Sequence, residues 1–175
     1  MTAMIRPAHP RDTATLARLK LATFRETFID GFAIPYPPDE LALFEEASYA
    51  PAIVAAELAD AAKATWIAEE SGRMLGYAQV GPCKLPHPDV RRDAGELYQL
   101  YILNKAQGQG LGRRLLAQAL SNLAVRHPGP VWLGVWSGNL AAQRFYAAHG
   151  FAKAGEYRFP VGRSWFDDEF IFRRG

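Results

Sequence analysis

The sequence is nearly free of cysteine, since Cys83 is the single one among 175 residues. One thiol cannot form an internal disulfide or a cysteine-based metal cluster. A lone cysteine can be a nucleophile, but Cys83 has no recognisable nucleophile signature around it, and a small packing residue is the simpler interpretation. The sequence also implies no metal ion, because its histidines lack metal-ligand spacing; they are His9, His87, His127 and His149.

Charge of one sign and long hydrophobic runs are scarce as well. The net charge is only +2, and the arginine pairs stand apart, so the sequence has no basic patch for nucleic acid or for a membrane surface. No stretch approaches the roughly 20 apolar residues of a membrane span. The first residues, MTAMIRPAHPRDT, lack the apolar segment of a signal peptide. We therefore expect a soluble cytoplasmic protein that binds neither nucleic acid nor membrane.

The apolar pattern predicts one α/β domain over residues 1–175, with a mixed, mostly antiparallel sheet of about seven strands flanked by helices. The composition is ordinary for a globular protein, with 49% hydrophobic and 22% charged residues. Asp12 is expected to cap a helix that begins at Thr13 and runs to about Ile29. We expect strands at 3–7, 65–71, 74–80, 95–103, 131–136, 151–161 and 164–174, and further helices at 39–49, 51–62, 111–126 and 140–149.

Three alternating glycines lie in the segment QGQGLG, residues 107–112, between a predicted strand and a predicted helix. Free N–H groups at a helix start and the helix dipole favour an anion there, and glycine lets a phosphate approach the backbone. A triphosphate loop requires Gly-Lys, a pair that this sequence lacks. The dinucleotide pattern G-x-G-x-x-G fails too, because Arg113 stands where its third glycine belongs. A tight turn without a ligand is the alternative to an anion site.

The segment resembles the signature Q/R-x-x-G-x-G/A of the GNAT superfamily of acetyl-CoA-dependent N-acetyltransferases. Gln107, Gly110 and Gly112 occupy its fixed positions. A second block, VWLGVWSGNLAAQRFYAAHGF, resembles the family's fifth strand and the helix after it, and IRPA resembles the usual first strand. The sequence departs from the pattern at Asn104, where many members have proline. The resemblance covers nearly the whole chain.

The resemblance implies a single GNAT-like fold whose fourth and fifth strands, 95–103 and 131–136, splay apart around acetyl-CoA. It assigns the cofactor's pyrophosphate to the backbone of Gln107, Gly108, Gln109, Gly110, Leu111, Gly112 and Arg113. It assigns the pantetheine arm and acetyl group to the backbone of Leu100, Tyr101 and Ile102, with Asn139 at the next helix start. The sequence leaves open whether Gly134 allows a close approach of the cofactor or only fills a packing gap.

The resemblance also makes Tyr146 the acid that protonates the leaving thiolate. Asn139 and Tyr146 are seven residues apart, so they share a helix face, whereas Ala141, Phe145 and Ala148 are expected to face the core. A half-buried tyrosine with a satisfied hydroxyl is the alternative.

An amine acceptor must also lose a proton, and a carboxylate is the usual base. Glu96 is our candidate. Strict alternation would place Glu96 on the face of Tyr98, Leu100 and Ile102, although a bulge in this strand would break that parity. A solvated carboxylate at the end of the strand is the alternative.

The acceptor itself is predicted to be a small-molecule amine. TFRETF and the last strand resemble bacterial polyamine acetyltransferases, and we expect Phe28 and Tyr36, with Glu96, to contact the acceptor. A polyamine requires carboxylates, and several lie in the first third of the chain, where many would simply solvate helix faces; they are Glu26, Asp30, Asp39, Glu40, Glu45 and Glu46. A protein N-terminal or lysine acetyltransferase and an inactive acetyl-CoA-binding regulator are the alternatives. The sequence leaves open a monomer or a homodimer.

Overall fold

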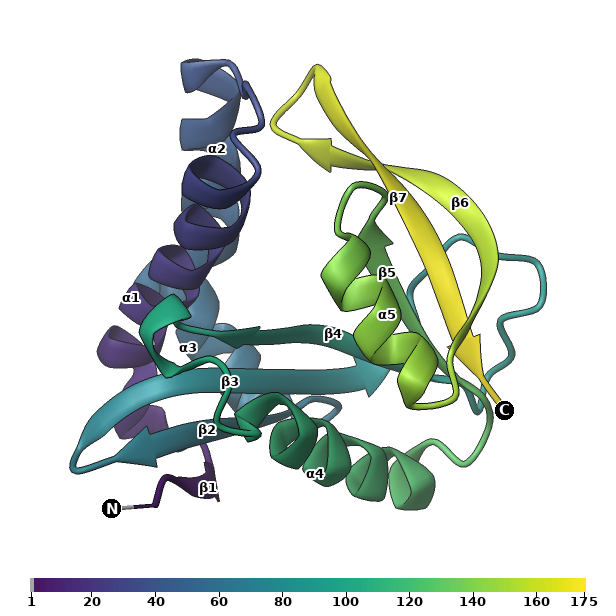
Figure 1. The fold of residues 1–175 in the computed structure, drawn as a ribbon, viewed down its shortest axis with the longest axis horizontal. Coiled ribbons are helices and arrows are strands. Elements are labelled where there is room, and N and C mark those ends of the chain that lie inside the picture. The colour runs from purple at the N-terminus through teal and green to yellow at the C-terminus, as the bar shows by residue number, and fades with distance from the viewer. Residues whose placement is uncertain (1) are drawn as a thin grey trace.

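The computed structural model describes residues 2–175, which form one seven-stranded sheet with helices on both faces (Figure 1). The strand order is β1-β2-β3-β4-β5-β7-β6, antiparallel except for β4 beside β5. This confirms the predicted mixed, mostly antiparallel sheet. The strands are β1 (Met4–Pro7), β2 (Ala64–Glu70), β3 (Arg73–Pro82), β4 (Gly95–Ile102), β5 (Val131–Trp136), β6 (Ala152–Val161) and β7 (Trp165–Arg174).

The helices also begin and end close to the predicted positions. They are α1 (Thr13–Phe24), α2 (Pro38–Tyr49), α3 (Pro51–Ala59), α4 (Leu111–Arg126) and α5 (Leu140–Ala148). The predicted first helix continues past Phe24 as a π-helical turn, η2 (Arg25–Gly31), which brings the chain to the edge of the site described below. Such turns are often found at functional sites. Among the described residues, none of the helices is long and apolar enough to cross a membrane.

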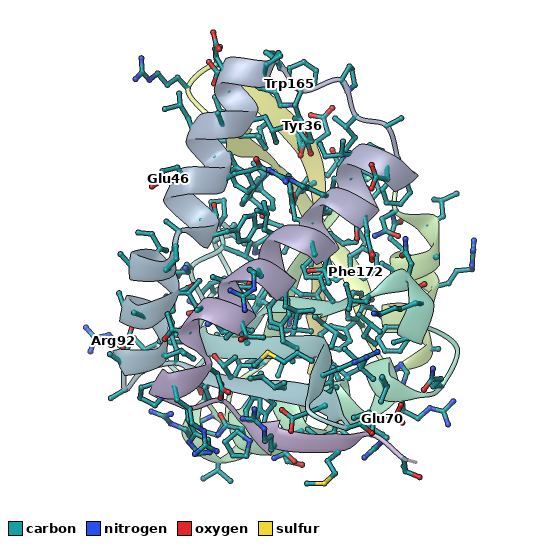
Figure 2. The ribbon with its side chains drawn as sticks, turned by 90° about the vertical axis from the view of Figure 1, so that its left-hand side faces the viewer. Tyr36, Glu46, Glu70, Arg92, Trp165 and Phe172 are labelled. Carbon is teal, nitrogen blue, oxygen red and sulfur yellow. The ribbon has the colours of Figure 1, made fainter. Side chains whose placement is uncertain are left out.

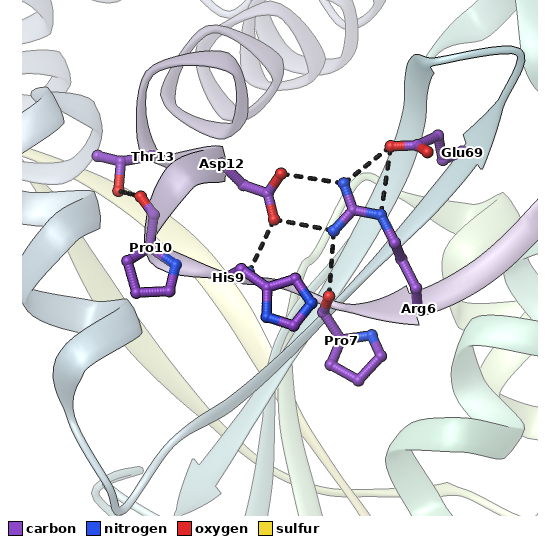
Figure 3. Close-up of polar contacts among 7 residues, drawn as sticks. All are labelled: Arg6, Pro7, His9, Pro10, Asp12, Thr13 and Glu69. Atoms are coloured by element: carbon purple, nitrogen blue, oxygen red, sulfur yellow. Dashed lines mark hydrogen bonds and ion pairs between the residues drawn. The ribbon is translucent and has the colours of Figure 1, made fainter.

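Asp12 precedes α1, but its side chain does not cap the helix. The carboxylate instead accepts hydrogen bonds from Arg6 at 2.8 and 2.9 Å and from the backbone N–H of His9 at 2.7 Å (Figure 3). Arg6 also binds Glu69 on β2. The predicted helix cap is therefore wrong. Asp12 binds the charged guanidinium of Arg6 on β1, which is a stronger partner than the free N–H groups of α1. The guanidinium lowers the pKa of Asp12 to about 2.

The two faces of the sheet carry separate hydrophobic cores. On one face α4 packs Leu111, Leu115, Leu116 and Leu123 against β3 and β4. On the other face α1 and α3 pack Leu16 and Val54 against Ile67 and Tyr77. In Figure 2, Tyr36 and Trp165 lie close together at the far end of this second face, where α2 meets the hairpin of β6 and β7.

The sheet opens between β4 and β5. These strands pair only at Gly95 with Val131 and at Glu96 with Trp132, and beyond that point they diverge, which confirms the predicted splay. In Figure 1, β4 runs across the view while β5 and β7 rise steeply away from it. The backbone groups of β4 that follow Glu96 therefore have no strand beside them on this side, and they are available to a ligand.

Candidate active site

Neighbouring cavities follow the opening between β4 and β5, and each shares wall residues with the next. A groove of about 390 Å³ lies along the glycine segment, and we call it the loop groove. The outer cleft, of about 480 Å³, lies between η2, β4 and α5. The middle gap, of about 70 Å³, lies between β4 and β5. The inner cavity, of about 170 Å³, lies beyond it, between the N-terminal helices and the β6–β7 hairpin.

The glycine segment wraps the start of α4, as the sequence predicts. Gly108 and Gly110 have φ angles of +79° and +78°, in the left-handed region where glycine carries no steric penalty. Beside both glycines lies open space, since an added Cβ would meet nothing within 4 Å. The loop groove is lined by Gln107, Gly108, Gly110, Leu111, Gly112 and Arg113, while the neighbouring Gln109 is exposed. This geometry fits an anion held by backbone N–H groups.

Gln107 fastens the segment to the end of β4. Its side-chain nitrogen Nε2 donates to the carbonyl oxygen of Ile102 at 3.2 Å and to Oδ1 of Asn104 at 3.3 Å. These bonds give a structural reason for a glutamine before the glycines: it fixes the loop relative to the strand. Asn104, the departure from the family pattern, takes part in the same contact.

The outer cleft brings β4 and α5 together. Leu100, Tyr101 and Ile102 form one wall, and Asn139 and Tyr146 belong to the other. Asn139 caps α5, because its Oδ1 accepts the N–H of Ala142 at 3.1 Å. Tyr146 and Asn139 also line the middle gap, so the predicted shared helix face is confirmed.

The prediction for the opposite face of α5 is wrong for Ala141 and Ala148, whereas Phe145 does pack against the core. Ala141 and Ala148 are exposed, and Phe145 is only half-buried. Ala141 and Phe145 line the outer cleft next to Tyr146. The reason is that α5 borders the splay, so more of its circumference faces open space than on a helix that covers a closed sheet.

Tyr146 is buried, and burial raises the pKa of its phenol well above the usual range. The hydroxyl is therefore protonated at neutral pH. It can donate a proton but cannot act as a base there.

Glu96 does not share the face of Leu100 and Ile102, because β4 has a bulge at Tyr98. Gln79 pairs with Gln99 and Val80 with Leu97, so Tyr98 is the extra residue. The bulge shifts the parity, and Glu96 faces the inner cavity with Tyr101. Burial raises the pKa of Glu96 to about 7, although the backbone N–H of Lys84 donates to it at 2.8 Å.

The residues predicted to contact the acceptor amine lie together in the inner cavity, which is lined by Phe28, Tyr36 and Glu96 among others. Tyr36 donates its hydroxyl proton to Asp167 at 2.7 Å, and the indole N–H of Trp165 donates to the same carboxylate at 3.0 Å. Aromatic rings from α1, η2 and α2 complete the wall; they include Phe24, Phe44 and Tyr49.

Sequence reasoning missed Asp167 and Glu169, which line this cavity from β7. Burial raises the pKa of Glu169 to about 7, and Tyr157 donates a hydrogen bond to it at 3.1 Å. The signal was present: the two acids are two residues apart in a predicted strand, so they share a face. Nothing in the sequence indicated that this face is buried.

Gly134 makes room for these groups. An added Cβ would lie 2.7 Å from Oη of Tyr157 and 3.1 Å from Oε1 of Glu169. Of the two interpretations that the sequence leaves open, the contacts favour close packing within the protein: side chains of β6 and β7 cross over this glycine.

None of the six acidic residues singled out in the first third of the chain lines the inner cavity, and three of them have partners elsewhere. Glu45 forms an ion pair with Arg25 at 2.8 Å, and Glu40 accepts hydrogen bonds from the β6–β7 turn. Glu26 accepts the backbone N–H of Asn104 at 2.8 Å and borders the outer cleft. The carboxylates of the inner cavity come instead from β4 and β7.

The other candidate groups lie outside the cleft. Burial raises the pKa of the Cys83 thiol to about 11, so it stays protonated at neutral pH and is a poor nucleophile. Within residues 2–175, no three His, Cys, Asp or Glu side chains are grouped so that they could hold a metal ion.

A splayed mixed sheet with a glycine loop at the start of α4 defines a class of acyltransferase, and the comparisons give the family. The sequence model of the Acetyltransferase (GNAT) family matches residues 21–151. An uncharacterised N-acetyltransferase of Mycobacterium bovis is 33% identical over 138 residues, which are 78% of this chain and 83% of that protein. The chain therefore belongs to the GNAT family, and it is an acetyl-CoA-dependent N-acetyltransferase.

A further relative and a solved structure are also similar to this chain. An uncharacterised N-acetyltransferase of Lactobacillus delbrueckii subsp. lactis is 28% identical over 142 residues, covering 81% of this chain and 82% of its own. The crystal structure of PaiA N-acetyltransferase from Thermoplasma acidophilum, in complex with coenzyme A, superposes with a TM-score of 0.77 over 99% of both chains. At 17% identity this second likeness concerns the fold.

Proposed function

We propose that this enzyme transfers the acetyl group of acetyl-CoA directly to a primary amine of a small molecule, and that polyamines are the acceptor class to test first. The observation that carries this proposal is the inner cavity. Glu96, Asp167 and Glu169 gather there among aromatic rings, and this combination attracts a cationic amine by charge and by cation–π contacts.

The order of the cavities supports the route of the reaction. The loop groove offers backbone N–H groups to the pyrophosphate, and the unpaired edge of β4 offers Leu100, Tyr101 and Ile102 to the pantetheine arm. The coenzyme A complex of the Thermoplasma relative, which shares this fold, is further support. A backbone N–H of β4 would stabilise the oxyanion that develops on the thioester carbonyl.

Tyr146 is the proposed general acid. It lines the middle gap, where the outer cleft meets the inner cavity, and its phenol keeps its proton at neutral pH. When the carbon–sulfur bond breaks, the thiolate takes this proton. The amine arrives from the other side of the sheet, so donor and acceptor have separate entrances.

Replacing Tyr146 by Phe tests this assignment together with the acceptor class. The wild-type rate is first measured by thiol release from acetyl-CoA with spermidine, 1,4-diaminobutane, benzylamine and a tetrapeptide. We expect the two polyamines to react fastest and the Y146F variant to lower kcat by about 100-fold, a typical loss for a general acid. Acetyl-CoA affinity, measured by calorimetry, should stay the same, because the ring is kept.

The controls separate the alternatives. A tetrapeptide that reacts faster than every small amine would indicate a protein acetyltransferase. Tight acetyl-CoA binding without turnover of any amine would contradict the enzymatic proposal and indicate a regulator. An unchanged Y146F rate would exclude Tyr146 as the acid.

A further inference from the structure

Glu169 lines both the middle gap, which it shares with Tyr146, and the inner cavity, which it shares with Glu96. We propose that Glu169 is the general base of the reaction, the group that takes the proton from the acceptor ammonium. This inference rests on the proposed transfer to a small amine and assigns one residue within it.

The splay is what allows Glu169 and Tyr146 to face one gap. Tyr146 packs with Phe172 and Leu133 on the α4 and α5 side of the sheet. Glu169 lies on the opposite face of β7, since Phe170 and Phe172 alternate with it and pack toward α5. In a closed sheet the two side chains would be separated by backbone. Here the missing pairing between β4 and β5 joins the two faces.

The strand register places Glu169 farther into the opening than Glu96. Glu96 is paired with Trp132, the last contact before β4 and β5 diverge. Glu169 is paired with Trp136, at the far end of β5. Four residues of strand separate these two backbone levels, about 13 Å at roughly 3.3 Å per residue, and the Glu169 carboxylate reaches back beside Gly134, halfway along this distance. Glu96 therefore lies where the sheet is still closed, whereas Glu169 lies beside the gap.

Glu169 also has the right surroundings for binding an ammonium. Tyr157 donates one hydrogen bond to its Oε1, and a carboxylate has several further acceptor sites. Gln99 lines the same gap, and within residues 2–175 its side-chain oxygen Oε1 is buried and has no hydrogen-bond partner. An amine placed there would satisfy this oxygen, since an orphaned buried acceptor is costly.

The groups around Glu169 suit a base at neutral pH. Burial is the main reason that the pKa of Glu169 rises to about 7; the charges of Asp167 on β7 and Glu96 on β4 add to the rise, and the Tyr157 bond from β6 opposes it. Tyr36 and Tyr101 also face the carboxylate, but burial raises their own pKa values well above neutral, so they do not titrate there. A base with a pKa near the working pH is the most effective.

Glu169 and Tyr146 handle separate protons in the transfer. The ammonium gives one proton to the Glu169 carboxylate, and the freed nitrogen lone pair forms the carbon–nitrogen bond with the thioester carbonyl. The carbon–sulfur bond then breaks, and the thiolate takes the Tyr146 proton. The new amide nitrogen loses its excess proton to the tyrosinate, and Glu169 returns its proton to solvent. One proton is released for each amide formed.

Replacing Glu169 by Gln tests the inference with the amine that the wild type acetylates fastest among the four above. We expect E169Q to lower kcat about 100-fold at pH 7, and its rate to rise about tenfold per pH unit toward the amine's own pKa, because only free amine then reacts. The rate of the wild type should instead become independent of pH above about pH 7. E169D, which keeps a carboxylate, should retain the levelling-off. Glu156→Gln, at an exposed position on the neighbouring strand, is the matched control.

Glu96→Gln decides between the two acids. If Glu169 is the base, E96Q raises the KM for the acceptor amine, and its rate still becomes independent of pH near pH 7. Loss of the levelling-off in E96Q and its retention in E169Q would overturn the inference. The unfolding midpoint and acetyl-CoA affinity of each variant show whether it is folded. A wild type that acetylates none of the four amines contradicts the proposed function itself and removes the inference with it, whereas an active wild type with an unaffected E169Q contradicts the inference alone.

Discussion

At the scale of the residue, two glutamates are held in surroundings that disfavour their charge. Glu96 and Glu169 are both largely buried, and burial raises each pKa from 4.5 to about 7. Between pH 4.5 and 7 the two carboxyl groups are ionised in the unfolded chain but still protonated in the folded protein. Their contribution to stability is therefore complete below pH 4.5 and is lost as the pH rises through 7.

Glu96→Gln should consequently make stability less sensitive to pH. The difference between the two pKa values corresponds to about 3 kcal/mol at most, so we expect E96Q to exceed the wild type in free energy of unfolding at pH 8 by up to that amount. At pH 4 the two should agree closely. Urea denaturation at both pH values measures the difference, with the exposed Glu156→Gln as control. If the free energy of unfolding fell by the same amount between pH 4 and 8 in E96Q and in the wild type, this account would be contradicted.

At the scale of the element, the glycines of the α4 loop have different tasks. Gly110 needs its positive φ, which costs other residues roughly 1–2 kcal/mol. Gly112 lies within the first turn of α4 with an ordinary φ, and an added Cβ would stand 3.5 Å from Cδ1 of Ile102, a normal contact. Gly110 therefore allows the backbone conformation of the loop, and Gly112 leaves the start of α4 without a side chain.

Gly110→Ala and Gly112→Ala separate these tasks. We expect G110A to lower the free energy of unfolding by about 1 kcal/mol and G112A to leave it unchanged or slightly higher, because alanine favours a helix. G112A should nevertheless weaken acetyl-CoA binding about tenfold, since the methyl group occupies the approach to the helix start. Urea denaturation and calorimetry give the two quantities. Full acetyl-CoA affinity in G112A would contradict the assignment of the loop groove.

At the scale of the whole molecule, the splay divides the sheet into two halves, β1–β4 and β5–β7. The short pairing between β4 and β5 joins these halves. The cavities lie along the opening between these halves. A ligand that hydrogen-bonds to the free edge of β4 would replace the missing strand and connect the halves.

Hydrogen exchange tests this consequence. In the free protein we expect fast exchange of the amides of residues 108–112 and of those amides within residues 99–102 that point toward β5, since the alternate amides of β4 are bonded to β3. Saturating acetyl-CoA should slow them several-fold, because the ligand provides hydrogen-bond partners and excludes water. The strand β2 lies away from the opening and serves as the internal control. Equal exchange of these segments with and without acetyl-CoA would contradict the proposed binding mode.

Much of this architecture was predictable because its signals are local. Alternation, helical periodicity and turn residues act within about ten residues, and they located every strand and helix closely. The alternating glycines Gly108, Gly110 and Gly112 predicted an anion site at this loop without any tertiary information. The same locality explains the errors. Asp12 found a partner on β1, and α5 borders an opening, which no local pattern records.

The sequence by itself determined the order of the elements, the family and the position of the glycine loop, because these depend on residues that are neighbours along the chain. Only the tertiary structure decided which carboxylates line the inner cavity. A bulge at Tyr98 turned Glu96 to the other face, and the splay opened a gap beside Glu169, which lies 73 positions away in the sequence. Burial, which sets the pKa of both acids, results from packing among distant segments, and it is a property of the folded chain alone.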